Sequence, residues 1–149
     1  MGQAPNKEDT SASISSDRFI GVWYDLAGYP DSPYARSKLT ITATGSLTIQ
    51  NYDELDNLMK EYVGTAKINK NKIILSLITK QGGLDVSYTI SYMDTRGLSI
   101  LEREDGSEVR ILSRDAFLTK SNLIFIKEKM ESLALEFNRL SLDQSVIKG

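Results

Sequence analysis

The 149-residue sequence contains no cysteine and no histidine. Without cysteine, the chain can form no disulfide, no thiolate nucleophile and no thiol metal site. Without histidine, it can build no Ser-His-Asp triad, no His-ligated zinc and no His-ligated haem. Any catalysis would depend on Asp, Glu, Lys, Tyr or Arg side chains, and no motif points to such an activity. We therefore expect no catalytic residue, no metal site and no cofactor.

Long apolar runs and a strong charge of one sign are also missing. No stretch approaches the roughly 20 apolar residues of a membrane-spanning helix. The net charge is −2 without a long basic run, so nothing predicts binding to nucleic acid. The first eighteen residues lack the apolar centre of a signal peptide. The chain as given fits the cytoplasm, and it fits the periplasm or secretion if a signal peptide has been removed.

The length fits a single domain after a polar start. We expect residues 1–16 to form a flexible leader and residues 17–149 to form the domain. Short runs of β-favouring residues then alternate with turn signals about every eight to twelve residues, which predicts an antiparallel sandwich or barrel. The predicted strands cover residues 20–27, 38–43, 46–52, 61–68, 72–78, 84–93, 98–102 and 109–113. Residues 53–60 are polar and acidic, and we expect a longer loop or one helical turn there.

The stretch 19–30 holds the only tryptophan, Trp23. Because strand side chains alternate, one face would carry Gly21, Trp23, Asp25 and Ala27. A face with one large ring and two very small residues is typical of a barrel that is plugged at its floor and hollow above.

The spacing of apolar residues changes in the last thirty residues or so. From Ser121 to Leu140 they fall at steps of three and four, which predicts a helix over 121–140. Thr119 or Ser121 can cap its start. After a run of strands, the apolar stripe of a single helix can bury against the outside of the sheet. Val146 and Ile147 in the tail are candidates for a short edge strand.

Three short motifs resemble the signatures of the lipocalin family, most closely its small bacterial-type members. Gly21-Val22-Trp23-Tyr24, followed by Ala27 and Tyr29-Pro30, resembles the first signature. Tyr92-Met93-Asp94-Thr95-Arg96 resembles the second, a turn between the sixth and seventh strands, but lacks the tyrosine usual after the aspartate. Ile111-Leu112-Ser113-Arg114 resembles the third.

The resemblance implies a mostly β, calycin-type fold: an eight-stranded antiparallel up-and-down β-barrel with one C-terminal α-helix packed on the outside. It also implies that Gly21, Trp23, Asp94 and Arg114 are scaffold residues, with Arg114 stacked on Trp23. A guanidinium over an indole gains about 1–2 kcal/mol when it is partly desolvated.

The resemblance further implies that the barrel binds and carries a small hydrophobic or amphipathic molecule, such as a fatty acid or lysophospholipid. The residues expected to contact it are Asp25, Ala27, Tyr29, Tyr34, Tyr88, Ile90 and Tyr92. Tyr29 and Tyr34 flank the loop expected to lie across the open end, where they can meet the ligand or cover the rim. A one-residue slip would move the sixth-strand candidates to the outer face.

Two other functions stay open at this stage. One is an enzyme built on the same barrel, such as an isomerase or a pigment lyase. The other is a protein-interaction module that uses the barrel loops. The sequence predicts no oligomeric state.

Overall fold

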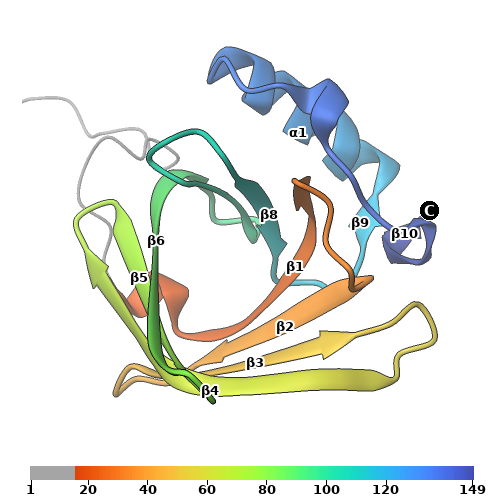
Figure 1. Cartoon of the computed structure of the whole chain (residues 1–149). Helices are drawn as coiled ribbons and strands as arrows, with labels where there is room; N and C mark the ends of the chain where they lie inside the picture. Colours follow the sequence, from red (N-terminus) through yellow and green to blue (C-terminus); the bar gives the residue numbers. More distant parts are fainter. Residues whose placement is uncertain (1–15) are drawn as a thin grey trace, which may run out of the picture.

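The computed structural model describes residues 16–149, and the predicted leader lies almost entirely outside these residues. Eight antiparallel strands follow one another around a closed barrel, with β8 pairing back onto β1 (Figure 1). The strands are β1 (Gly21–Tyr29), β2 (Arg36–Ile41), β3 (Ser46–Tyr52), β4 (Leu58–Asn69), β5 (Lys72–Thr79), β6 (Gly82–Met93), β7 (Leu98–Glu102) and β8 (Val109–Ser113). The predicted up-and-down barrel is confirmed.

Strand β4 begins earlier than predicted. Lys60 pairs with Asn51 and Leu58 pairs with Tyr52, so the predicted loop over 53–60 shrinks to a tight turn. The carboxylate of Asp53 holds this turn by accepting the backbone N–H groups of Leu55 and Asn57, both at 2.9 Å. The turn therefore continues a hairpin rather than forming a separate loop or a helical turn.

The helix α1 spans Lys120–Ser132, so the predicted range of 121–140 is too long. Thr119 caps its start, and its side chain accepts the N–H of Asn122 at 3.0 Å. The helix ends because Ala134 turns into the left-handed region with φ 60°, where the N–H of Leu135 reaches back to the carbonyl of Met130 at 2.8 Å. The apolar spacing continues past this point because Leu133, Phe137 and Leu140 still pack against the same buried cluster.

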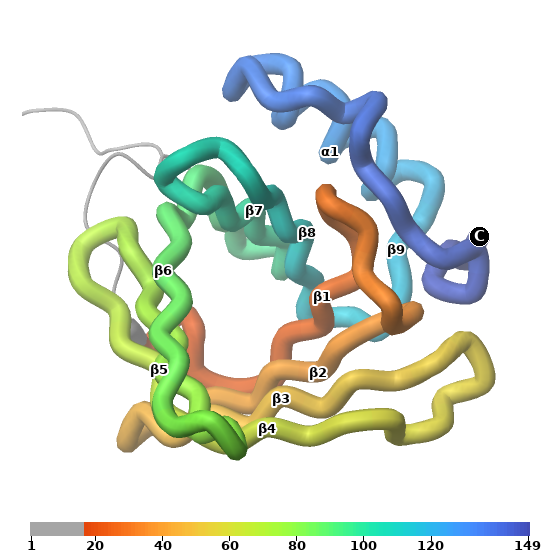
Figure 2. The backbone as a smooth tube through the Cα atoms, in the orientation of Figure 1, coloured from red at the N-terminus to blue at the C-terminus, as the bar shows by residue number. Residues whose placement is uncertain are grey.

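The tail beyond α1 runs back along the barrel wall. It contains the 3₁₀ turns η2 (Phe137–Arg139) and η3 (Gln144–Val146), while η1 (Ser16–Phe19) precedes β1. The short strand β10 (Ile147–Lys148) pairs in parallel with β9 (Leu118–Thr119), which confirms a short strand close to the predicted one. Figure 2 shows α1, β9 and β10 outside the ring of strands, beside β1 and β8.

Two separate apolar clusters lie on the two faces of the barrel wall. The inner cluster includes Trp23, Leu75, Ile90 and Leu112. The outer cluster lies beneath α1 and the tail; it includes Leu26, Tyr92, Ile111, Ile126 and Met130. The position of α1 on the outside of the barrel is thus confirmed.

Two β-bulges decide which residues belong to which cluster. In β1, Asp25 pairs with Leu112 but Ala27 pairs with Ile111, so Leu26 is an extra residue. In β6, Ile90 pairs with Leu101 but Tyr92 pairs with Ile100, which makes Ser91 the extra residue. Each extra residue reverses the alternation of side chains beyond it.

The expectation that Ala27, Tyr29 and Tyr92 line the barrel interior is therefore wrong. All three belong to the outer cluster. The guanidinium carbon of Arg139 lies 4.3 Å from the ring centre of Tyr29. Tyr92 packs against Phe125 of α1 with ring centres 5.6 Å apart. These tyrosines hold the helix and tail on the barrel wall.

Candidate functional site

Trp23 closes one end of the barrel. Its ring packs on Phe19 with centres 5.1 Å apart, and the guanidinium carbon of Arg114 lies 3.9 Å from the indole. Arg114 also donates from Nη1 to the carbonyl of Val22 and from Nη2 to that of Arg18, both at 2.8 Å. The stacking of Arg114 on Trp23 is as expected, and it ties the start of β1 to the end of β8.

The turn between β6 and β7 is built around the carboxylate of Asp94, which has no exposed side-chain surface. Its Oδ1 accepts the backbone N–H groups of Arg96, Gly97 and Leu98 at 2.9, 3.0 and 3.1 Å. Its Oδ2 accepts the hydroxyl of Tyr92 at 2.6 Å and Nε of Arg96 at 3.1 Å. Burial raises the pKa of Asp94, but these hydrogen bonds and the charge of Arg96 outweigh it, so the pKa is lowered from its ordinary value.

A cavity of about 250 Å³ lies inside the barrel, above this closed end. Its apolar lining comes from Leu39, Ile49, Leu75, Leu101 and Leu112. The polar lining comes from Asp25, Ser37, Asn51, Tyr88 and Arg110, and the loop residues Ser32, Pro33 and Tyr34 border it. The cavity thus combines an apolar floor with a polar wall.

An ion pair between β1 and β8 forms one side of the cavity. Nε of Arg110 donates to both oxygens of Asp25 at 3.1 and 3.0 Å, and Nη2 donates to Oδ1 at 2.8 Å. Nη1 of Arg110 donates to the carbonyl of Pro30 at 3.2 Å, which ties the loop after β1 to β8. Burial lowers the pKa of Arg110, but the charge of Asp25 outweighs it and raises that pKa, so the guanidinium stays charged.

Tyr88 on β6 faces the cavity from another side. Its hydroxyl donates to Oε2 of Glu108 at 3.0 Å, and Glu108 also pairs with Arg103 at 3.6 Å. Burial and the negative charge of Glu108 raise the pKa of Tyr88 well above its ordinary value. The phenol therefore stays protonated, with its hydrogen committed to Glu108.

Solved structures with the same architecture show what the chain is similar to. Insecticyanin from the tobacco hornworm Manduca sexta aligns with a TM-score of 0.67 at 10% identity, over 97% of this chain and 89% of that one. Lobster apocrustacyanin A1 aligns with a TM-score of 0.58 at 15% identity, over 99% and 94%. A variant of LTBP1 in complex with leukotriene C4 aligns with a TM-score of 0.61 at 12% identity, over 91% and 94%. No family model and no curated protein matches the sequence.

The chain has the lipocalin fold. At these identities the likeness concerns the fold alone. The three signature-like motifs occupy the places expected in this fold. Trp23 and Arg114 meet at the closed end, and Asp94 lies in the turn between β6 and β7.

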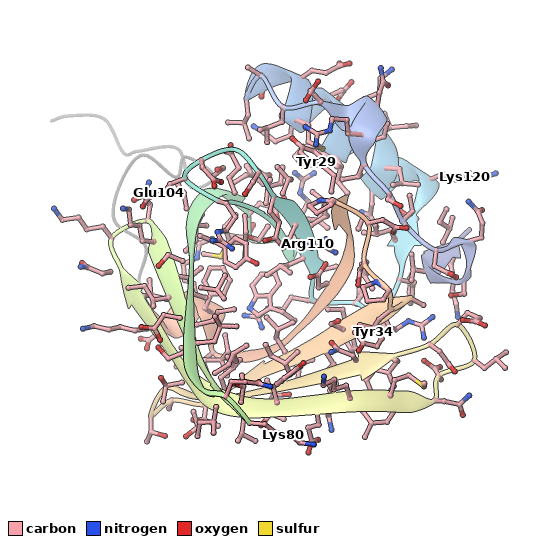
Figure 3. All side chains as sticks on the ribbon, in the orientation of Figure 1. Tyr29, Tyr34, Lys80, Glu104, Arg110 and Lys120 are labelled. Atoms are coloured by element: carbon pink, nitrogen blue, oxygen red, sulfur yellow. The ribbon has the colours of Figure 1, made fainter. Side chains whose placement is uncertain are left out.

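The lipocalin cavity contains three of the seven predicted ligand contacts: Asp25, Tyr34 and Tyr88. Ile90 faces the interior but is fully buried in the core and does not line the cavity. Ala27, Tyr29 and Tyr92 lie behind the wall. In Figure 3, Tyr29 lies next to α1, whereas Arg110 lies between β8 and β1.

The sequence interpretation missed the polar lining residues Arg110, Ser37 and Asn51. Arg110 carried a usable signal, because alternation in β8 places it on the same face as the buried Leu112. A charged residue on an inward face needs a partner, and Asp25 is the only acidic residue of β1. Ser37 and Asn51 had no such signal, because hydroxyl and amide residues occur on both faces of β2 and β3.

Among residues 16–149, no three His, Cys, Asp or Glu side chains are grouped to hold a metal ion. No helix in the same range has the length and hydropathy needed to span a membrane.

Proposed function

We propose that the protein binds and carries a small hydrophobic or amphipathic molecule inside its lipocalin barrel. The observation that carries this proposal is the cavity of about 250 Å³, with five aliphatic side chains on its floor and a few polar groups on its wall. Small-molecule sites in proteins have this composition: mostly apolar, with a small number of placed polar groups that orient the ligand.

The driving force would be burial of ligand hydrocarbon, at about 0.8 kcal/mol for each methylene. The cavity is held open by rigid elements. The ion pair between Asp25 and Arg110 joins β1 to β8, and Ser37 donates to Asn51 across β2 and β3 at 2.6 Å. Because these side chains are fixed by one another, little ordering cost remains when a ligand enters.

The fold likeness supports the proposal without identifying the ligand. LTBP1, a protein of the same architecture, has been solved in complex with leukotriene C4. That complex supports small-molecule binding by this architecture. The family resemblance implies a small hydrophobic or amphipathic ligand, for which fatty acids and lysophospholipids are only examples.

Native mass spectrometry of protein purified without lipid stripping tests the proposal. We expect an adduct of one small molecule per chain. Ile49→Phe places a ring in the cavity and should abolish the adduct. Leu84→Phe makes the same kind of change at a side chain that is 50% exposed and lies outside the cavity, and it should retain the adduct. An empty wild-type protein that also binds no member of an apolar ligand panel would overturn the proposal.

A further inference from the structure

We propose that the cavity selects a compact, uncharged molecule of roughly ten non-hydrogen atoms with a hydrogen-bond acceptor, and that Asp25 determines this specificity by excluding carboxylates. This inference rests on the proposed function and narrows its ligand class. Three observations carry it: the volume of the cavity, the donors that its wall leaves unused, and the charge already present there.

The volume sets the size of the ligand. An engineered apolar cavity of about 150 Å³ in another protein holds benzene, which has six carbon atoms. By proportion, the present cavity of about 250 Å³ holds roughly ten non-hydrogen atoms. A ring with a short substituent fits within this space, whereas most of a long acyl chain would lie outside it.

The wall offers free donors to such a ligand. Asn51 is 7% exposed, and its Oδ1 accepts the hydroxyl of Ser37 at 2.6 Å. No residue between 16 and 149 accepts a hydrogen bond from the amide nitrogen of Asn51. Arg110 has five N–H groups, of which three are engaged by Asp25 and Pro30. The hydroxyl of Tyr88 already donates its hydrogen bond to Glu108. The ligand group that the cavity can satisfy is therefore an acceptor, such as a carbonyl oxygen.

The charge on the wall argues against an acid as that ligand. Asp25 accepts hydrogen bonds from two nitrogens of Arg110, with the shortest contact at 2.8 Å. The positive charge of Arg110 is therefore already neutralised by this ion pair. A ligand carboxylate that approached Arg110 would place a second negative charge beside Asp25 at a site shielded from water. Two like charges in such a place repel strongly, and neither is adequately hydrated. A neutral amide or ketone meets the same donors without this cost.

The test compares cinnamamide with cinnamate, which have the same size and shape and differ in charge. Isothermal titration calorimetry at pH 7 should show that wild-type protein binds cinnamamide at least about tenfold more tightly than cinnamate. Asp25→Asn frees Arg110 and should reverse this order. Asp85→Asn makes the same chemical change at an exposed position of β6 outside the cavity, and it should leave the order unchanged.

A second variant keeps the inference testable if Asp25→Asn fails to fold. Asn51→Leu keeps the branching and the number of side-chain non-hydrogen atoms but removes the donor, so it should weaken cinnamamide severalfold without weakening the binding of n-propylbenzene. Equal or tighter binding of cinnamate by the wild type would overturn the inference while leaving the proposed function intact. If the wild type binds none of the three compounds and carries no adduct, both proposals fail.

Discussion

Replacing Asp94 tests how much its buried hydrogen bonds contribute to the stability of the protein. Asp94→Ala removes the acceptor of three backbone N–H groups and of the Tyr92 hydroxyl. Each buried donor left unsatisfied costs about 1–3 kcal/mol, and water that enters the turn recovers part of this. We expect the free energy of unfolding to fall by about 3–5 kcal/mol, a loss typical of breaking a buried polar network.

Asp94→Asn separates the charge from the shape of the side chain. The amide oxygen can still accept the three backbone N–H groups, but the amide nitrogen then faces the Tyr92 hydroxyl and Arg96. We expect a smaller loss, about 1–2 kcal/mol, because charge-assisted hydrogen bonds are roughly twice as strong as neutral ones. Urea unfolding followed by the fluorescence of Trp23, the only tryptophan, measures both variants in one assay.

The difference between wild type and Asp94→Asn should depend on pH. The folded protein lowers the pKa of Asp94 from its ordinary value, so the unfolded chain takes up the proton first as the pH falls. The stabilisation is therefore complete above the unfolded pKa of about 4 and is lost as the pH drops through the lower folded pKa. A difference that stays constant from pH 7 to pH 3 would refute this account of the turn.

Three further predictions concern stability, each measured by urea unfolding followed by far-ultraviolet circular dichroism, which does not depend on Trp23. Gly64→Ala should cost several kcal/mol, because a Cβ there would lie 1.9 Å from a backbone oxygen of β5; Gly83→Ala, with nothing within 4 Å, is the neutral control. Ala134→Gly should stabilise the protein by up to about 1 kcal/mol, since φ is 60° at that position. Trp23→Ala should cost about 3–5 kcal/mol. Arg114→Ala removes the stacking and two hydrogen bonds to carbonyls but leaves the indole in the core, so it should cost less. An unchanged unfolding midpoint in Trp23→Ala would contradict its placement in the core.

The order of the strands and the ends of three of them followed from short-range patterns. Strands β3, β7 and β8 begin and end at the residues that alternation and turn signals predicted. Such signals lie within ten residues or so of the segment that they define, which is why one sequence suffices to find them. The contact of Arg114 with Trp23 joins residues far apart in the chain. It was expected only because the motifs around these two residues resemble lipocalin signatures.

The end of the helix was missed because its stop has no usual marker. Helices commonly end at a glycine in the left-handed region, whereas this one ends at Ala134. The apolar positions beyond it keep helical spacing, because the tail packs on the same wall after the helix has stopped. Periodicity reports which residues face the wall, and it does not distinguish a helix from a chain that continues along the same surface.

The inward-facing residues were harder to predict than the strands. Whether a side chain points inward depends on the exact number of residues that precede it in its strand. Neither bulge residue, Leu26 nor Ser91, is a glycine, and nothing in its sequence surroundings marks an insertion. One undetected residue in β1 is enough to exchange the inside and outside positions of everything that follows it. The predicted inward direction is therefore found for Asp25, before the bulge, but not for Ala27 and Tyr29, after it.

The same bulges explain how one strand can serve two cores. Before its bulge, β1 contributes Trp23 to the floor and Asp25 to the cavity; after it, β1 contributes Ala27 and Tyr29 to the outer cluster. Without the reversal, the ring of Tyr29 would point into the mouth of the barrel, and the wall beneath Arg139 would lose its aromatic contact. The cavity is open because large side chains that alternation would direct inward are instead used to attach the helix and tail. The space available to a ligand therefore depends on the two bulges, which direct these side chains outward.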